Sequence, residues 1–323
     1  MSLLARILLA ALALGHDPTP LRVPESLLAI TSMPEASGVV WNPTLSRYLV
    51  VSDDTGLKEK GTNHAPWIFA LSREGVFDET PIPIAGIEKL NDAEALCSGP
   101  DDTLFLATSH SENKKGHVKA ARRRLFQLTL VGRTLKILGS FDLAGAIVEA
   151  GVIPSDSVDI EALSYHGGEL YVGLKAPQTA SGAAIVLKVR DVLSAMKDGA
   201  ISAGRISKFA DIPLAVEAAA GGGTVMEGIS DMGFLPDGSL LILGNSPKKR
   251  PPDGGGALWW RKPDGSVVML RRFLGLKPEG ISLSDDKKHI VIVFDNDRKL
   301  PLWLHIPIPK TTQAAVPQKK PSQ

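Results

Sequence analysis

The feature that most constrains the fold of this chain is an internal repeat led by an acidic residue. Five times along the chain, a glutamate followed by alanine or glycine comes shortly before two stretches rich in apolar residues. The five glutamates are Glu35, Glu94, Glu161, Glu227 and Glu279. Successive copies are 59, 67, 66 and 52 residues apart. Self-similarity at such a period is typical of a repeat architecture, in which one supersecondary unit recurs along the chain.

Each glutamate is followed by a short strand, a turn and a second β-rich run that ends in polar residues. In chain order, the second runs are Arg47 to Asp53, Thr103 to Ser109, Glu169 to Lys175, Ser239 to Asn245 and His289 to Asp295. Clusters of Gly, Pro, Asn and Asp supply the turns between the two strands. Third and fourth strands follow, for example Trp67 to Leu71. A repeat of this length that contains four strands is typical of one blade of a β-propeller.

We therefore predict an all-β fold, a β-propeller of five four-stranded blades, with six blades as the alternative. The 31 glycines and 23 prolines among 323 residues favour many turns and disfavour a helical bundle. The last repeat runs out after Leu302 to Ile308, whereas Leu21 to Ile30 reads as a spare strand ahead of the first glutamate. If this N-terminal strand completes the last blade, the ring closes and no open edge is left.

The two ends of the chain differ in composition from the repeats. We expect a signal peptide over residues 1–18, one propeller domain over residues 19–308 and a disordered tail over residues 309–323. The apolar run Ser2 to Leu14 is too short to span a bilayer and carries a small-x-small pattern at Ala11 to Ala13. This predicts export to the periplasm or secretion. The alternative is a cytoplasmic protein in which the run packs as an N-terminal helix.

Charge and cysteine content exclude several classes of partner. The chain has 36 basic and 35 acidic side chains, so nothing in its net charge predicts nucleic-acid binding. The basic cluster Lys119 to Arg124 has no interleaved aromatic residue, which favours a solvated loop. Cys97 is the single cysteine and has no metal-binding or redox spacing. We expect a monomer without a membrane span, whose partner is a small anionic molecule.

The repeat also predicts where chemistry would occur. The first strand of each propeller blade lines the central channel, so a residue repeated at its start recurs around the axis. Carboxylates that converge in this way either retain protons or hold a cation, and calcium suits loose oxygen ligation. The predicted calcium ligands are Glu35, Glu94, Glu161, Glu227, Glu279, Asp53, Asn245 and Asp295. In the alternative, the glutamates are structural and accept hydrogen bonds from the backbone of a neighbouring blade.

The loops after the second strands should open on the same rim as the glutamates. His110, within Ser109-His110-Ser111, offers a proton carrier, and we predict a catalytic role for it together with Glu94 and Glu161. Three lysines of these loops are predicted to bind an anionic substrate: Lys175, Lys114 and Lys248. The sequence contains no Walker loop, H-E-x-x-H motif, nucleophile elbow or paired C-x-x-C.

Five short segments resemble a bacterial family known as domain of unknown function 3616. They are Asp92 to Leu96, Ser109 to Ser111, Arg122 to Leu125, Asp159 to Leu163 and Gly173 to Pro177. The resemblance spans most of residues 30–308. That family is similar to the esterase-like domain of some phytases and, more distantly, to calcium-dependent propeller lactonases. The resemblance implies a propeller with a site on its top face. Two departures are that the first copy reads Glu-Ala-Ser-Gly and that histidine occurs in the rim loop of the second copy alone.

The predicted function is that of an exported propeller that binds calcium and hydrolyses a small anionic ester, phosphoester or lactone. The metal would polarise a carbonyl or phosphoryl oxygen and activate water. The alternative is a non-catalytic propeller whose rim binds a protein or a small ligand. The geometry of the glutamates separates the two hypotheses, because ligands converge on a shared point whereas structural carboxylates bond to backbone N–H groups.

Overall fold

The computed structural model describes residues 17–111, 118–119, 122–218, 223–246, 255–296 and 299–309. Nearly all of the expected signal peptide and of the expected tail lie outside these residues, so the domain boundaries and the export of the protein stay predictions. Within the described part, no helix has the length and apolar character needed to cross a membrane.

The fold is all-β and is built from antiparallel sets of four strands. One sheet has the order β10 (Asp159–His166), β11 (Glu169–Ala176), β12 (Ala184–Val189) and β13 (Ile206–Ile212). A second has the order β16 (Gly228–Phe234), β17 (Leu240–Asn245), β18 (Gly256–Arg261) and β19 (Val267–Phe273). A third has the order β20 (Lys277–Leu283), β21 (His289–Asp295), β22 (Leu302–Pro307) and β1 (Thr19–Pro20).

The remaining long strands form an eight-stranded sheet made of two such sets. The first set is β2 (Ala36–Asn42), β3 (Arg47–Ser52), β4 (Trp67–Leu71) and β5 (Ile82–Ala85). The second is β6 (Ala93–Ser98), β7 (Leu104–Thr108), β8 (Leu125–Val131) and β9 (Thr134–Phe141). A short parallel pairing of β5 with β9 joins the two sets. A separate hairpin consists of β14 (Ala215–Glu217) and β15 (Thr224–Met226).

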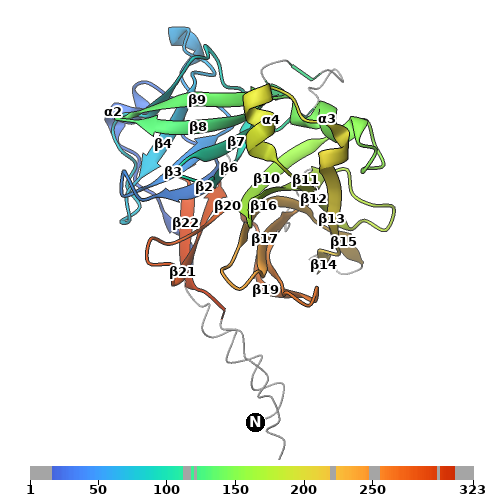
Figure 1. Ribbon diagram of the computed structural model, residues 1–323. Coiled ribbons are helices and arrows are strands. Elements are labelled where there is room, and N and C mark those ends of the chain that lie inside the picture. The colour runs from blue at the N-terminus through green and yellow to red at the C-terminus, as the bar shows by residue number, and fades with distance from the viewer. Residues whose placement is uncertain are drawn as a thin grey trace, which may run out of the picture.

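The first strands of the five sets contact one another in a closed ring. Strand β2 contacts β6, β6 contacts β10, β10 contacts β16, β16 contacts β20, and β20 contacts β2. Figure 1 shows these strands gathered near the centre of the molecule, with the later strands of each set farther out. The ring is tight: a Cβ atom at Gly280 would lie 2.9 Å from the backbone nitrogen of Val39. The small residues that follow the glutamates thus allow neighbouring strands to approach closely.

The N-terminal segment completes the last sheet, but through different residues from those predicted from the sequence. Strand β1 pairs with β22, Thr19 opposite Trp303 and Pro20 opposite Leu302. The predicted strand Leu21 to Ile30 is wrong, because this segment leaves the sheet and forms the short helix α2 (Glu25–Leu28). Pro24 has no N–H to offer a strand partner, and its carbonyl instead accepts from the first turn of the helix.

Few of the described residues are helical, and the two longest helices among them, α3 (Leu143–Glu149) and α4 (Val192–Asp198), cover one part of the sheets (Figure 1). Asp142 caps α3, since its side chain accepts from the Gly145 N–H at 2.9 Å. Apolar side chains of both helices join the core cluster between the second and third sets of strands. The described part of the chain also contains the 3-10 turns η1 (Lys58–Lys60) and η3 (Ala203–Arg205).

Candidate functional site

Each innermost strand contains a β-bulge at the same place, which leaves one residue out of the pairing with the next strand. The residues left out are Ser37, Glu94, Glu161, Ser230 and Glu279. A bulge re-aims the side chain that it carries and interrupts the alternation of the strand. Three of the five repeated glutamates therefore occupy equivalent positions, whereas Glu35 and Glu227 do not. Glu35 lies two residues before its bulge, the position that Asp92 and Asp159 hold in the next two sets.

Glu161 forms an ion pair with Lys175 across strands β10 and β11. Lys175 Nζ lies 2.6 Å from Glu161 Oε1, and the two side chains are 17% and 6% exposed. Burial raises the pKa of Glu161, although Lys175 opposes this shift. Burial alone would lower the pKa of Lys175, but Glu161 and Glu279 outweigh it and raise that pKa above its ordinary value. Lys175 is therefore a fixed positive charge at the centre of the ring.

A second lysine, Lys277, stands near the bulge of β20. Its Nζ contacts Glu279 and lies 3.2 Å from Asp295 Oδ2. The neighbouring carboxylates raise the pKa of Lys277 against the opposing effect of burial. Burial raises the pKa of Glu279, while Lys277 and Lys175 lower it. We refer to Asp53, Glu94, Asp159, Glu161, Lys175, Lys277 and Glu279 as the inner cluster.

The half-buried residues Asp53 and Asp159 add two carboxyl groups to the inner cluster. Ser37 Oγ donates to Asp53 Oδ1. Burial, together with Asp92 and Glu279, raises the pKa of Asp53 to about 7 against the effects of Lys277 and Ser37. Burial likewise raises the pKa of Asp159 to about 6. Both groups thus titrate closer to neutrality than an ordinary aspartate.

Asp92 is held by its own set of donors. Ser109 Oγ donates to its Oδ2, Arg122 Nη1 lies 2.8 Å from the same oxygen, and Ser111 Oγ lies 3.3 Å from it. Arg122 Nε also donates to Asn91 Oδ1 at 2.6 Å. Ser109, directly after β7, takes the place in its set that Lys175 takes in the set of β10 and β11. Its hydroxyl donates to Asp92 and not to the bulge residue of its own set.

Glu94, the bulge residue of β6, is consequently left without a local donor. Its side chain is buried, at 8% exposure, and no described residue donates a hydrogen bond to it or forms an ion pair with it. Burial raises its pKa well above the ordinary value, and the charges of Asp53, Glu161 and Asp92 raise it further against Lys175. Glu94 is thus a buried inner-cluster glutamate with neither a hydrogen-bond donor nor an ion-pair partner among the described residues.

Two of the predicted calcium ligands instead bond to residues of neighbouring strands. Trp259 Nε1 donates to Glu227 Oε2 at 3.0 Å, and Arg272 pairs with Oε1. Asn245 Nδ2 donates to the carbonyl of Pro278 at 2.8 Å. The backbone-bonded structural role that we considered for the glutamates is performed by Asp231, which was not predicted. Asp231 accepts from the Ile281 N–H at 2.7 Å and so links β16 to β20.

His110 is not brought into the inner cluster. It is buried and adopts a left-handed conformation with φ of 60°, and its Nδ1 lies 2.6 Å from the Thr108 carbonyl. It lines a separate pocket of about 190 Å³ together with Arg123 and Asp156. Burial lowers the pKa of His110 to about 4, so the imidazole is neutral at pH 7. Lys114 and Lys248 lie outside the described residues.

The arrangement does not fit the predicted five-glutamate calcium ring. Glu227 is held by Arg272 and Trp259, while Glu161 and Glu279 are paired with lysines whose charge opposes a second cation. Within the residues that the structure describes, no group of three or more His, Cys, Asp or Glu side chains could hold a metal ion. Glu35 is half-buried and lines another pocket, beside Asp54 and His64.

The sequence interpretation missed several charged residues that the structure places in or beside the cluster. Lys277, Asp92 and Asp159 each lie two residues before a bulge residue, in the segments KPEG, DAEA and DIEA. This constant spacing of two residues before the bulge residue is the sequence signal that could have identified them. His64, whose Nδ1 lies 3.2 Å from Asp54 Oδ1, had no comparable pattern.

No protein-family model matches the chain, and no curated protein matches it in sequence. Among solved structures, a hypothetical protein from Leishmania major matches with a TM-score of 0.52 at 10% identity, covering 94% of each chain. A gluconolactonase from Xanthomonas campestris matches with a TM-score of 0.41 at 14% identity, covering 92% of this chain and 97% of the other. A calcium-binding regucalcin from Agrobacterium tumefaciens matches with a TM-score of 0.42 at 12% identity, covering 90% and 96%.

Likeness at these identities concerns the fold alone. The resemblance to the domain family described from the sequence stays a prediction.

Proposed function

We propose that this protein is a five-bladed propeller hydrolase that cleaves a small anionic ester or lactone at the inner cluster. The closed ring of first strands, each leading a set of four, supports the blade count. The observation that carries the activity is Glu94, a buried carboxyl group without a donor among the described residues, set in one cluster with two lysines. Perturbed carboxyl groups of this kind concentrate at sites of proton transfer.

Glu94 acts as the general base in this proposal. Burial and the neighbouring carboxyl groups raise its pKa well above the ordinary value, so its carboxylate is a stronger base than that of a solvent-exposed glutamate. The carboxylate takes a proton from water as the water oxygen bonds to the carbonyl carbon. The bond from that carbon to the leaving oxygen then breaks, and the leaving oxygen receives the proton back from Glu94. The products are an acid and an alcohol, or a hydroxy acid from a lactone.

Lys175 and Lys277 supply positive charge where the substrate becomes more negative. Both remain protonated because acidic neighbours raise their pKa values. Glu161 and Glu279 hold the two ammonium groups in place, so little reorganisation is needed as the oxyanion forms. These lysines provide the charge that calcium was expected to provide, and no step of the reaction is assigned to a metal.

The test is a panel of lactones, carboxylic esters and phosphoesters offered to the purified protein and to Glu94→Gln. Glutamine keeps the size of the side chain but cannot take the proton, so kcat should fall at least about 100-fold, the usual lower range for loss of a general base. Glu149→Gln, at an exposed position on α3, is the matched control and should retain full activity. Full activity of Glu94→Gln would overturn the assigned base. A protein inactive on the whole panel would favour the non-catalytic binding module.

A further inference from the structure

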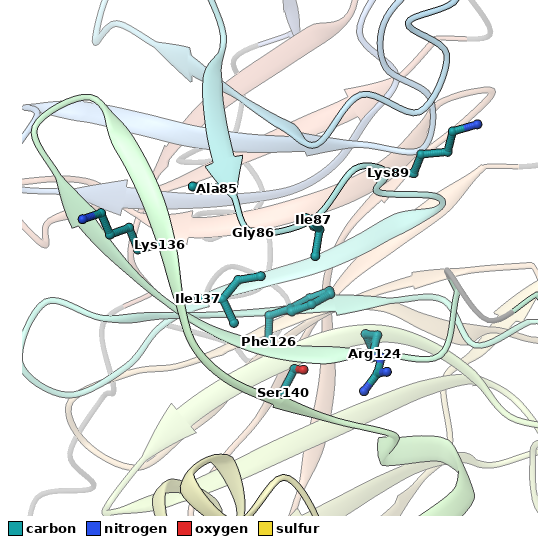
Figure 2. A pocket seen from close by; sticks show the side chains of 9 residues that line it. All are labelled: Ala85, Gly86, Ile87, Lys89, Arg124, Phe126, Lys136, Ile137 and Ser140. Atoms are coloured by element: carbon teal, nitrogen blue, oxygen red, sulfur yellow. The ribbon is translucent and has the colours of Figure 1, made fainter.

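A pocket of about 590 Å³ lies at the joint between the first two sets of strands (Figure 2). Strand β5 pairs with β9 through Ile84 and Ala85, opposite Leu135 and Lys136. Strand β5 ends there, whereas β9 continues to Phe141. Beyond Lys136, the edge of β9 that faced β5 therefore has no described strand beside it, and the pocket occupies this gap.

Helix α4 limits the gap at its other end. A Cβ atom at Gly139 would lie 2.2 Å from the carbonyl oxygen of Met196, so the helix lies directly against β9 at this glycine. The stretch of β9 between its pairing with β5 and the helix is thus two residues long, Ile137 and Leu138. An added peptide strand needs a longer run of free backbone, so the gap suits a compact molecule better than a peptide.

The floor of the pocket is apolar. Phe126, which is 5% exposed, lies beside Ile137 and Ile87 in Figure 2. All three residues belong to, or pack against, the core cluster shared by the first two sets of strands. A flat ring could rest on the Phe126 and Ile137 side chains and remove apolar surface from water.

Three positive charges frame this floor. Figure 2 shows Lys89 and Lys136 on opposite sides of the pocket and Arg124 beyond Phe126. All three side chains are exposed, and none forms an ion pair with a described residue. None of the described lining residues is acidic. Uncompensated charge of one sign around a concave surface raises the local concentration of anions.

We propose that this pocket binds a small organic anion with a flat apolar body, such as an aromatic carboxylate or sulfonate. The volume lies within the usual ~300 to 1,000 Å³ of small-molecule sites. The apolar floor takes the ring and the three cations take the charged group. No lining residue belongs to the inner cluster, so the pocket is a second site and does not depend on the proposed hydrolysis.

The test is a calorimetric titration of the full-length protein with 2-naphthoate, with neutral 2-naphthamide and with inorganic phosphate. We expect 2-naphthoate to bind, and the other two probes to bind at least about fivefold more weakly, because each lacks one half of the interaction. Arg124→Gln and Lys136→Gln should each weaken 2-naphthoate binding by up to about fivefold, the range of one exposed charge pair. Their combination should weaken it further, with an unchanged melting temperature.

Lys197→Gln, an exposed lysine at the end of α4, is the matched control and should bind 2-naphthoate like the wild type. Three results would each overturn the proposal. They are the absence of 2-naphthoate binding at millimolar concentration, equal affinity for 2-naphthoate and 2-naphthamide, and unchanged affinity in the Arg124→Gln/Lys136→Gln double variant.

Discussion

Lys175 and Glu161 form their 2.6 Å ion pair from positions on either side of the Ile160–Leu174 pair, and both positions are left out of the pairing of strands β10 and β11. The irregularity that interrupts the ladder is therefore also what presents the two charges toward the centre of the ring. In the preceding set, the same bulge presents Glu94, but its neighbour Ser109 is engaged by Asp92. The same kind of bulge thus carries a lysine-paired glutamate in one set and, in the set before it, a glutamate without a partner among the described residues.

The first prediction concerns the ion pair itself. Lys175→Met should lower the free energy of unfolding by ~3 kcal/mol, because it leaves the buried carboxyl group of Glu161 without its partner. Adding Glu161→Gln should recover most of this loss, since the remaining amide carries no charge. Urea denaturation of the two single variants and the double variant measures the coupling.

Lys188→Met is the control for this experiment. Lys188 pairs with Glu169 at 3.2 Å on the same sheet, but both side chains are close to one-third exposed. Its loss should cost less than ~1 kcal/mol. Equal losses for Lys175→Met and Lys188→Met would contradict the view that the inner pair is electrostatically important.

The all-β class was predictable from the sequence, because the five apolar double runs and their turns recur at a regular period and the structure confirms the strands they predict. The N-terminal strand was misplaced, since the pattern of Leu21 to Ile30 is apolar but Pro24 diverts it into a helix. Burial of Leu21 and Leu27 explains the apolar pattern without any strand.

The site was harder to predict because the five repeats were aligned on the glutamate, whereas the β-bulge defines the equivalent positions. Glu35 and Glu227 share the residue pattern of the other glutamates, yet they stand outside the bulges that define equivalent positions. A bulge inserts one residue into a strand, and nothing in the alternation of apolar residues shows which residue is left out. The pairing of Lys277 with Glu279 was missed for the same reason, since both lie in a segment that was aligned on the glutamate alone.

The second prediction is a dependence of stability on pH that arises from Asp53. Its pKa is raised to about 7 in the folded protein, against 3.8 for an ordinary aspartate. Between these pH values the folded state binds the proton more tightly than the unfolded chain. The free energy of unfolding should therefore fall as pH rises through this window, by about 1.4 kcal/mol for each pKa unit of difference.

Asp53→Asn tests this contribution. Asparagine can still accept from Ser37 but does not titrate, so the variant should lose less stability between pH 4 and pH 7 and should exceed the wild type above pH 7. Asp198→Asn, at an exposed position, is the control. Parallel stability curves for wild type and Asp53→Asn, measured by urea denaturation across this range, would show that Asp53 titrates normally.

The third prediction concerns calcium. The melting temperature should respond little to millimolar calcium or to a chelator, because lysines already neutralise Glu161 and Glu279. A bound ligand would stabilise the folded state by about 2.7 kcal/mol at a hundredfold excess over its Kd, so its effect on the melting temperature would be plain. A calcium-dependent rise that disappears in Glu94→Gln would restore the metal-dependent hydrolase. Magnesium serves as the control for ionic strength.

The last prediction concerns closure of the ring by the N-terminal segment. Deletion of residues 1–30 removes strand β1 together with the buried side chains of Leu21 and Leu27. Each buried leucine contributes ~1.5 to 3 kcal/mol, so the melting temperature should fall sharply. The deletion also exposes the edge of β22, which should promote self-association that size-exclusion chromatography detects. Deletion of residues 1–16 is the matched control, because it keeps every contact described for this segment. Identical melting temperatures and elution volumes for the two truncated proteins would mean that β1 does not hold the ring closed.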